Sequence, residues 1–207
     1  MTETSKETVY VVDDDPAVVR SVGRLLRSES FEVRSFGSPA EFLKSLAAEA
    51  CGCVVLDVAM PGLDGLQLQR ALFERGCDLP VLFLTGRGDI PGSVQAMKRG
   101  AVDFLLKPVE DEKLLEAVRL ALEKDRARRS ERAQRAEILR RLSTLTARER
   151  QVFEGVAAGL LNKQIASELG TALKTVKIHR GRMMKKMGAE SVAELVRQAD
   201  RAGIRRF

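Results

Sequence analysis

Acidic, hydroxyl and amino side chains follow four short apolar runs in the first half of the sequence. Behind the runs at 9–12, 54–56, 81–84 and 104–106 stand Asp13, Asp14, Asp57, Thr85 and Lys107. Clustered carboxylates repel one another, and a hard cation such as Mg²⁺ that bridges them keeps them all ionised. A carboxylate held against Mg²⁺ can attack a phosphoryl group and form an acyl phosphate. Lys107 would neutralise phosphoryl charge there, and the Thr85 hydroxyl would donate a hydrogen bond.

The elements around these residues predict how they meet. The four runs are rich in β-branched residues, which is typical of buried strands in a parallel sheet, and a fifth strand alternates at 31–36. Helices are expected at 16–27, from 39, at 66–75, at 90–98 and from 110. Together they predict a doubly wound α/β sheet, whose site lies beyond the carboxyl ends of its strands. The polar residues would therefore converge at one edge, where a cis Lys107–Pro108 bond could aim the ammonium group inward.

The charge distribution divides the chain. Its net charge of +6 combines 14 basic and 19 acidic residues in 1–122, 8 and 4 in 123–142, and 13 and 6 in 143–207. An acidic front and a basic back suggest a cation-binding signalling module joined to a nucleic-acid-binding one. The chain shows no apolar run long enough to cross a membrane and no signal peptide, and its three cysteines are expected to be reduced thiols of a cytoplasmic protein.

Three segments are expected from these patterns. Residues 1–122 form the α/β domain, 123–142 a charged helical linker, and 143–207 an all-α domain. The linker lacks Gly and Pro, and its apolar residues are too sparse for the heptads of a coiled coil. After a capping box at 146–149, the last segment predicts only short helices, at 162–169, 174–187 and 191–202. Gly170 between the first two of these is typical of a helix-turn-helix unit.

The helix expected at 174–187 is strongly basic. It carries six Lys or Arg side chains and the only histidine of the chain, His179, while Val176, Met183, Met184 and Met187 are placed for the core. Such a helix would follow phosphates and present a few side chains to base edges. We therefore expect this domain to bind double-stranded DNA.

The first segment resembles the receiver domain of two-component response regulators. The resemblance rests on the motifs at 12–15, 56–65, 85–86 and 100–108, and it covers nearly all of 7–122. It implies that Asp57 accepts a phosphoryl group from a sensor histidine kinase. It also implies that Asp14 and Asp57 bind Mg²⁺ directly, with Asp13 nearby or acting through water and the carbonyl group of Ala59 as a further ligand. Thr85 and Phe104 would form the switch pair.

The last segment resembles the LuxR-type helix-turn-helix of the FixJ/NarL regulators, through the motifs at 145–149, 162–166, 175–180 and 185–187. The segment at 88–91 is closest to the FixJ branch. This implies dimerisation on phosphorylation and transcriptional control at promoters, with RNA polymerase as a further partner. Gly181 departs from relatives that carry a long polar side chain there, so Arg182 could substitute. The candidate DNA contacts are Asn162, Lys163, Lys174, Thr175, Lys177, Ile178, His179, Arg180, Arg182 and Lys185.

Three other functions fit these residues less well. A Mg²⁺-dependent aspartyl-phosphate phosphatase needs a second Asp two residues after its nucleophile, where this chain has Ala59, so we expect no enzyme. An RNA-binding regulator needs aromatic stacking, and 143–207 holds only Phe153 and Phe207. A receiver that serves only as a phosphate sink would not carry a DNA-binding domain.

Overall fold

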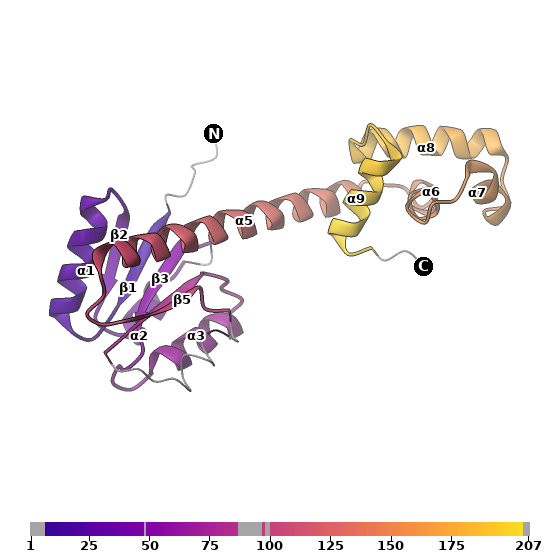
Figure 1. Ribbon diagram of the computed structural model, residues 1–207. Coiled ribbons are helices and arrows are strands. Elements are labelled where there is room, and N and C mark those ends of the chain that lie inside the picture. The colour runs from indigo at the N-terminus through magenta and orange to yellow at the C-terminus, as the bar shows by residue number, and fades with distance from the viewer. Residues whose placement is uncertain (1–6, 48, 87–96, 98–99, 205–207) are drawn as a thin grey trace. The chain divides into compact units, whose positions relative to one another are not determined.

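The computed structural model describes residues 7–47, 49–86, 97 and 100–204. The chain divides into two compact units, here called the N-terminal unit (Met1–Arg128) and the C-terminal unit (Arg129–Phe207). The N-terminal unit is a sheet flanked by helices, and the C-terminal unit is helical (Figure 1). The segment at 88–91 and the helix predicted at 90–98, apart from the helical Met97, lie outside the described residues.

A parallel sheet of five strands, in the order β2-β1-β3-β4-β5, forms the N-terminal unit and confirms the predicted doubly wound architecture. The strands are β1 (Thr8–Val12), β2 (Glu32–Phe36), β3 (Gly52–Asp57), β4 (Val81–Thr85) and β5 (Asp103–Leu106). β1, β3 and β4 are buried along their whole length. Helices cover both faces of these strands, which explains why their sequences are continuous apolar runs rather than alternating ones.

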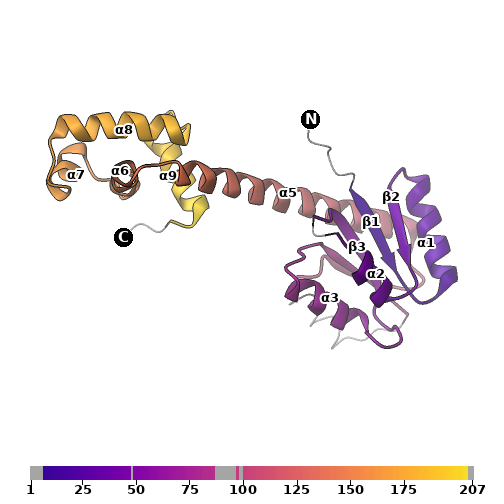
Figure 2. The same ribbon diagram turned by 180° about the vertical axis from the view of Figure 1, so that it is seen from behind.

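Two hydrophobic cores lie on the two faces of this sheet. Helices α1 (Pro16–Ser28) and α5 (Asp111–Ser143) pack on one face, and α2 (Pro39–Ser45) and α3 (Gly65–Glu74) on the other (Figures 1 and 2). Alternate strand residues supply the two cores, because successive side chains of a strand point to opposite faces. In β1, for example, Val9 and Val11 lie in the first core, and Tyr10 and Val12 in the second.

Three aromatic rings anchor the second core. Tyr10 lies with its ring centroid 5.6 Å from that of Phe42, and Phe42 lies 5.4 Å from Phe36. All three residues are buried, and Phe42 is fully enclosed. Tilted ring pairs at these separations stabilise a core beyond the area that they bury. Burial also raises the pKa of Tyr10, because desolvation disfavours the phenolate.

The C-terminal unit contains α6 (Ala147–Ala157), α7 (Asn162–Glu168), α8 (Leu173–Met187) and α9 (Val192–Ala202). The predicted capping box is present, since the Thr146 hydroxyl accepts from the amide of Glu149 and the Glu149 carboxylate accepts from the amide of Thr146. Val176, Met183 and Met187 are fully buried, as expected from the sequence, whereas Met184 is half-buried and packs against the same core. Helices α7 and α8, with the turn that contains Gly170, have the helix-turn-helix arrangement.

Helix α5 contributes side chains to one core of the N-terminal unit and to the core of the C-terminal unit. Leu114 and Val118 lie in the first core of the N-terminal unit, whereas Ile138 and Leu142 lie in the core of the C-terminal unit. The predicted linker 123–142 is therefore helical throughout, and most of its charged side chains are exposed. Among the described residues, no helix has both the length and the apolar content needed to cross a bilayer.

Candidate functional sites

Three carboxylates meet at the carboxyl edge of the N-terminal sheet. Asp13 follows β1 and Asp57 ends β3, and the pairing of Val12 with Leu56 brings the two acids side by side. One oxygen each from Asp13, Asp14 and Asp57 lies within 4.8 Å of the others. Asp13 and Asp57 are buried, while Asp14 is exposed, so the cluster opens to solvent on one side. Oxygen donors in this arrangement suit a hard divalent cation such as Mg²⁺.

Lys107 joins the two buried carboxylates. Its Nζ lies 2.5 Å from Asp13 Oδ2 and 2.7 Å from Asp57 Oδ1. The remaining oxygens accept backbone hydrogen bonds, Asp13 Oδ1 from the amide of Asp15 at 2.9 Å and Asp57 Oδ2 from that of Ala59 at 2.8 Å. Every carboxylate oxygen of this buried pair therefore has a donor.

The pKa values follow from burial and from this ion pairing. Desolvation raises the pKa of Asp13, and the hydrogen bond from Lys107 opposes this only in part. For Lys107, burial lowers the pKa, but hydrogen bonds and charge from Asp13 and Asp57 outweigh it and raise the pKa overall. Lys107 is therefore a firmly charged ammonium at this edge of the sheet.

Lys107 follows β5, which lies two strands from the β3 strand that carries Asp57, and a backbone hydrogen bond fixes its position. Its amide donates to the carbonyl oxygen of Thr85 at 2.7 Å, which ties the end of β5 to the end of β4. The Lys107–Pro108 peptide bond is cis, as predicted. Thr85 itself is buried at the end of β4, one position beyond the residue that pairs with Asp57. Thus the acids, the hydroxyl group and the ammonium group predicted from four strand ends share one edge.

Phe104 lies half-buried on the edge strand β5. Its ring centroid is 5.9 Å from that of Phe83, at an interplanar angle of 39°. Phe83 and Phe104 are also register partners across β4 and β5. A half-buried ring on an edge strand has space on its solvent side, which a switch residue needs.

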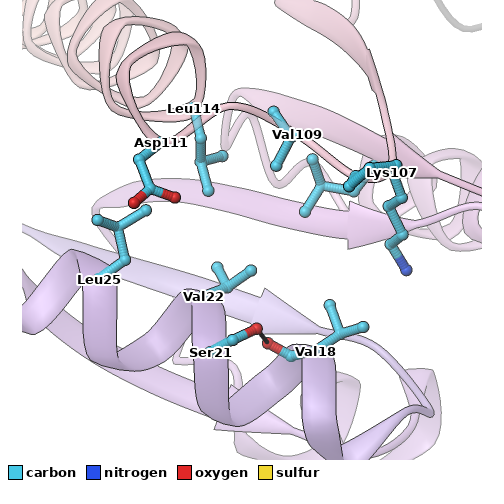
Figure 3. A pocket seen from close by; sticks show the side chains of 10 residues that line it. Val18, Ser21, Val22, Leu25, Lys107, Val109, Asp111 and Leu114 are labelled. Atoms are coloured by element: carbon cyan, nitrogen blue, oxygen red, sulfur yellow. Dashed lines mark hydrogen bonds between the residues drawn. The ribbon is translucent and has the colours of Figure 1, made fainter.

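An apolar pocket of about 460 Å³ adjoins Lys107 and was not predicted (Figure 3). Its walls come from α1, with Val18, Val22 and Leu25, and from the connection between β5 and α5. Val22 is buried in the first core, and Val18 and Leu25 are partly buried against that core. All three are apolar residues of the helix predicted at 16–27, and such a pattern indicates a packed face but not a pocket beside it.

The predicted DNA contacts form two groups in the helix-turn-helix. Six are exposed, and the other four are half-buried. The exposed group is Lys163, Lys174, Lys177, Ile178, Arg182 and Lys185, and the half-buried group is Asn162, Thr175, His179 and Arg180. A strongly cationic, accessible face on α8 is what phosphate binding requires.

Two of the half-buried residues contact each other. Arg180 Nη1 donates to Asn162 Oδ1 at 2.5 Å, which links the middle of α8 to the start of α7. His179 has a buried Nδ1 atom with no hydrogen-bond partner among the described residues. A Cβ atom at Gly181 would meet nothing within 4 Å, so this position leaves open space beside the exposed cations of α8.

Lys186 is a cation of α8 whose ammonium group contacts the protein instead of extending into solvent. Its Nζ lies 2.6 Å from Glu149 Oε2 and 3.0 Å from the carbonyl oxygen of Thr144. Glu149 is buried, and the hydrogen bond from Lys186 and those from Thr146 lower its pKa to about 2. The capping box had been found in the sequence, but this distant partner had not, because only the packing of α6 against α8 brings the two together.

Replacing Glu149 by Gln should destabilise the C-terminal unit by about 1–3 kcal/mol, because Lys186 loses its buried counter-charge. The folded pKa of Glu149 lies below its usual value, so its contribution is complete above about pH 4.5. It disappears as the pH falls toward 2. Urea unfolding, monitored by hydrogen exchange of the α6 and α8 amides, measures the change in the free energy of unfolding. Glu154→Gln breaks only an exposed pair with Arg150, at 3.7 Å, and should cost less than about 0.5 kcal/mol. Equal effects of the two substitutions would contradict the assignment.

Comparison with known proteins gives two family matches. Residues 9–119 match the response regulator receiver domain, and residues 143–199 match the luxR family of bacterial regulatory proteins. Together the two matches account for most of the chain, and they fall on the N-terminal and C-terminal units respectively.

Relatives of similar length support both matches. The chain is 49% identical to nodulation protein W of Bradyrhizobium diazoefficiens, over 97% of this chain and 88% of that protein. It is 44% identical to the transcriptional regulatory protein FixJ of the same species, over 97% of this chain and 98% of that protein. Among solved structures, the response regulator StyR aligns with a TM-score of 0.84 and 44% identity, over 95% of this chain and 99% of that one. Full-length FixJ from B. japonicum aligns with a TM-score of 0.59 and 44% identity, over 98% and 100%.

Proposed function

Because this chain belongs to the two-component response regulators that join a receiver domain to a LuxR-type DNA-binding domain, we propose that Asp57 is its phosphoacceptor. The observation that carries the proposal is the cluster of Asp13, Asp14 and Asp57 with Lys107 bound to its two buried members. Response regulators interact with sensor kinases and with promoter DNA. Here the phosphoryl donor is a phosphohistidine of the cognate sensor kinase.

The reaction is a transfer between two side chains. Asp57 Oδ1 attacks phosphorus, the phosphorus–nitrogen bond to the donor imidazole breaks, and that nitrogen keeps the electron pair, so Asp57 becomes an acyl phosphate. Lys107 moves from the Asp57 oxygen to the phosphoryl oxygens and neutralises part of their charge. The Ala59 amide, which already donates to Asp57 Oδ2, holds the carboxylate in place.

Receiver domains generally bind Mg²⁺ at their acidic pocket, and the oxygen donors of this cluster fit that cation. We propose Asp14, Asp57 and the carbonyl oxygen of Ala59 as its direct protein ligands, with Asp13 nearby or acting through water. When bound, Mg²⁺ would offset the negative charge of the carboxylates and of the phosphoryl group.

Replacing Asp14 by Asn should weaken Mg²⁺ binding at least about tenfold, since the site loses one of its negatively charged oxygen ligands. Isothermal titration calorimetry of the full chain with MgCl₂ measures the affinity. Asp15→Asn is the matched control, because it removes a neighbouring charge while Asn still caps α1. Unchanged Mg²⁺ affinity in Asp14→Asn would remove Asp14 from the ligand set.

Phosphorylation would then act through Thr85 and Phe104. The Thr85 hydroxyl gains a partner only when the phosphoryl group is present, and a ligand shifts an equilibrium only through such differential contacts. The half-buried Phe104 ring turns inward as the hydroxyl moves. We propose that the altered face of the receiver dimerises, and that the dimer binds promoter DNA and engages RNA polymerase.

The output surface is the exposed face of α8, with Lys163 on α7. Lys174, Lys177, Arg182 and Lys185 would contact phosphates, and Ile178 lies among them. Arg180 and Asn162 would act together because they are hydrogen-bonded. The ten predicted contacts remain a proposal, as do the boundaries 1–122, 123–142 and 143–207 and the cytoplasmic location.

An enzyme is the second candidate that was considered. The family is one of transcriptional regulators, which is not an enzyme class. At the position two residues after Asp57, Ala59 has no side chain that could protonate a leaving group. The test that separates the functions is incubation with acetyl phosphate and Mg²⁺. A response regulator accumulates one phosphoryl group per chain by intact-mass measurement, whereas a phosphatase would turn over and release phosphate continuously.

A further inference from the structure

Hydrogen bonds hold helix α5 to the amino-terminal ends of the strands, at the opposite end of the sheet from Asp57. Three contacts make this fastening, here called the α5 clasp, and all of them lie within the N-terminal unit. They are Gly52 N to Asp125 Oδ2 at 3.0 Å, Arg126 to Glu7 through two hydrogen bonds of 2.7 Å, and Arg128 Nη1 to the Asp78 carbonyl oxygen at 3.1 Å.

Asp125 is the central member of the clasp. Only 5% of it is exposed, whereas Arg126 and Arg128 are exposed, and buried hydrogen bonds to charged groups are worth more than exposed ones. Gly52 is shaped for the contact. Its φ is +124°, and a Cβ atom there would come within 1.8 Å of the Thr8 carbonyl oxygen, so a glycine is needed where the carboxylate reaches the backbone.

The three α5 members of the clasp, Asp125, Arg126 and Arg128, lie beyond the end of the receiver family match at residue 119. Without it, the last α5 side chain buried in the N-terminal unit would be Leu122, and the next buried one is Ile138. The stretch 123–137 would then stand without core contacts. An isolated helix of about 12–15 residues is only marginally stable in water, and with the clasp the stretch that lies outside both the core and the clasp shortens to 129–137.

We propose that Asp125 is a positioning residue that keeps the stretch 123–137 helical and so couples the phosphorylation state of the N-terminal unit to DNA binding by the C-terminal unit. The role of Asp125 in coupling the two units rests on the proposed function, whereas its role in keeping the helix intact does not. A helix that frays between two cores would absorb a change in one of them, whereas an intact helix passes it on.

Hydrogen exchange on the full, unphosphorylated chain tests the first clause. Asp125→Ala should speed exchange of the amides in 123–137 by roughly tenfold, the effect of losing one net hydrogen bond. Asp125→Asn keeps an acceptor oxygen for the Gly52 amide and should stay within about threefold of the wild type. The control Lys124→Ala changes an exposed neighbour and should leave exchange unchanged.

Three outcomes would overturn this clause. One is wild-type exchange of 123–137 in Asp125→Ala. A second is that exchange of the β1 and β3 amides in Asp125→Ala speeds up as much as exchange of 123–137, which would show a general loss of folding. A third is a larger effect from the Arg126→Ala/Arg128→Ala double variant, which leaves Asp125 intact.

DNA affinity before and after treatment with acetyl phosphate tests the second clause. The gain in affinity on phosphorylation should fall at least about threefold in Asp125→Ala and be retained in Asp125→Asn, with equal phosphoryl uptake in both. An undiminished gain in Asp125→Ala would overturn the coupling. If the wild type itself showed no gain while exchange changed as expected, the proposed function would fail and the role of the clasp in holding the helix would stand.

Discussion

Replacement of Asp57 by Asn should abolish phosphoryl uptake from acetyl phosphate in the presence of Mg²⁺. The amide is nearly isosteric with the carboxylate, and its oxygen can still accept from the Ala59 amide, so the fold persists while the nucleophile is lost. Intact-mass measurement should detect the phosphorylated form in the wild type and none in the variant. We expect at least a hundredfold difference in initial rate.

Asp64→Asn is the matched control for this experiment. Asp64 caps α3 on the neighbouring loop, and Asn is an equally good cap, so the variant loses one carboxylate without losing the helix start. It should take up phosphoryl at the wild-type rate.

Sedimentation of the wild type and Asp57→Asn after the same treatment should show more dimer in the phosphorylated wild type and no change in Asp57→Asn. Uptake by Asp57→Asn equal to that of the wild type would overturn the central assignment.

The second large effect is expected from Lys177→Ala, which should weaken promoter binding by the phosphorylated protein by about 3- to 30-fold. Lys177 is exposed on α8, and each phosphate contact releases about one counterion. The slope of log affinity against log salt should therefore fall by about one. Fluorescence anisotropy with labelled promoter DNA at several salt concentrations measures both quantities.

Arg197→Ala removes the same charge from an exposed position on α9, outside the helix-turn-helix. It should leave affinity within about twofold and the salt slope nearly unchanged. Should Arg197→Ala weaken binding as much as Lys177→Ala, the effect would be one of net charge. Lys177 would then have no place in the interface.

The carboxyl-edge site was predictable because each of its parts lies next to a strong local signal. Asp13, Asp57, Thr85 and Lys107 directly follow buried apolar runs, and a parallel sheet brings such ends together whatever the loops do. The sequence could not predict that Lys107 bridges Asp13 and Asp57 simultaneously. That geometry depends on the strand order, which places β5 two strands from β3.

Contacts between distant segments could not be predicted for the same reason. Lys186 was one of several similar cations on a basic helix, and only the packing of α6 against α8 pairs it with Glu149. Asp125 was one of many charges in a linker expected to be solvated, and its burial depends on the start of β3. Periodicity shows which face of a helix is apolar. It does not show which single charge on the polar face meets a distant backbone amide.

The aromatic cluster of the second core has a consequence for spectroscopy. The chain contains one tyrosine and no tryptophan, so Tyr10 is the only strong intrinsic fluorophore. It is buried against Phe36 and Phe42 in the N-terminal unit. Tyrosine fluorescence and near-ultraviolet circular dichroism above the phenylalanine bands therefore report on the packing of the receiver alone. Far-ultraviolet circular dichroism reports on both units, so the difference between the two signals isolates the unfolding of the DNA-binding helices without any added label.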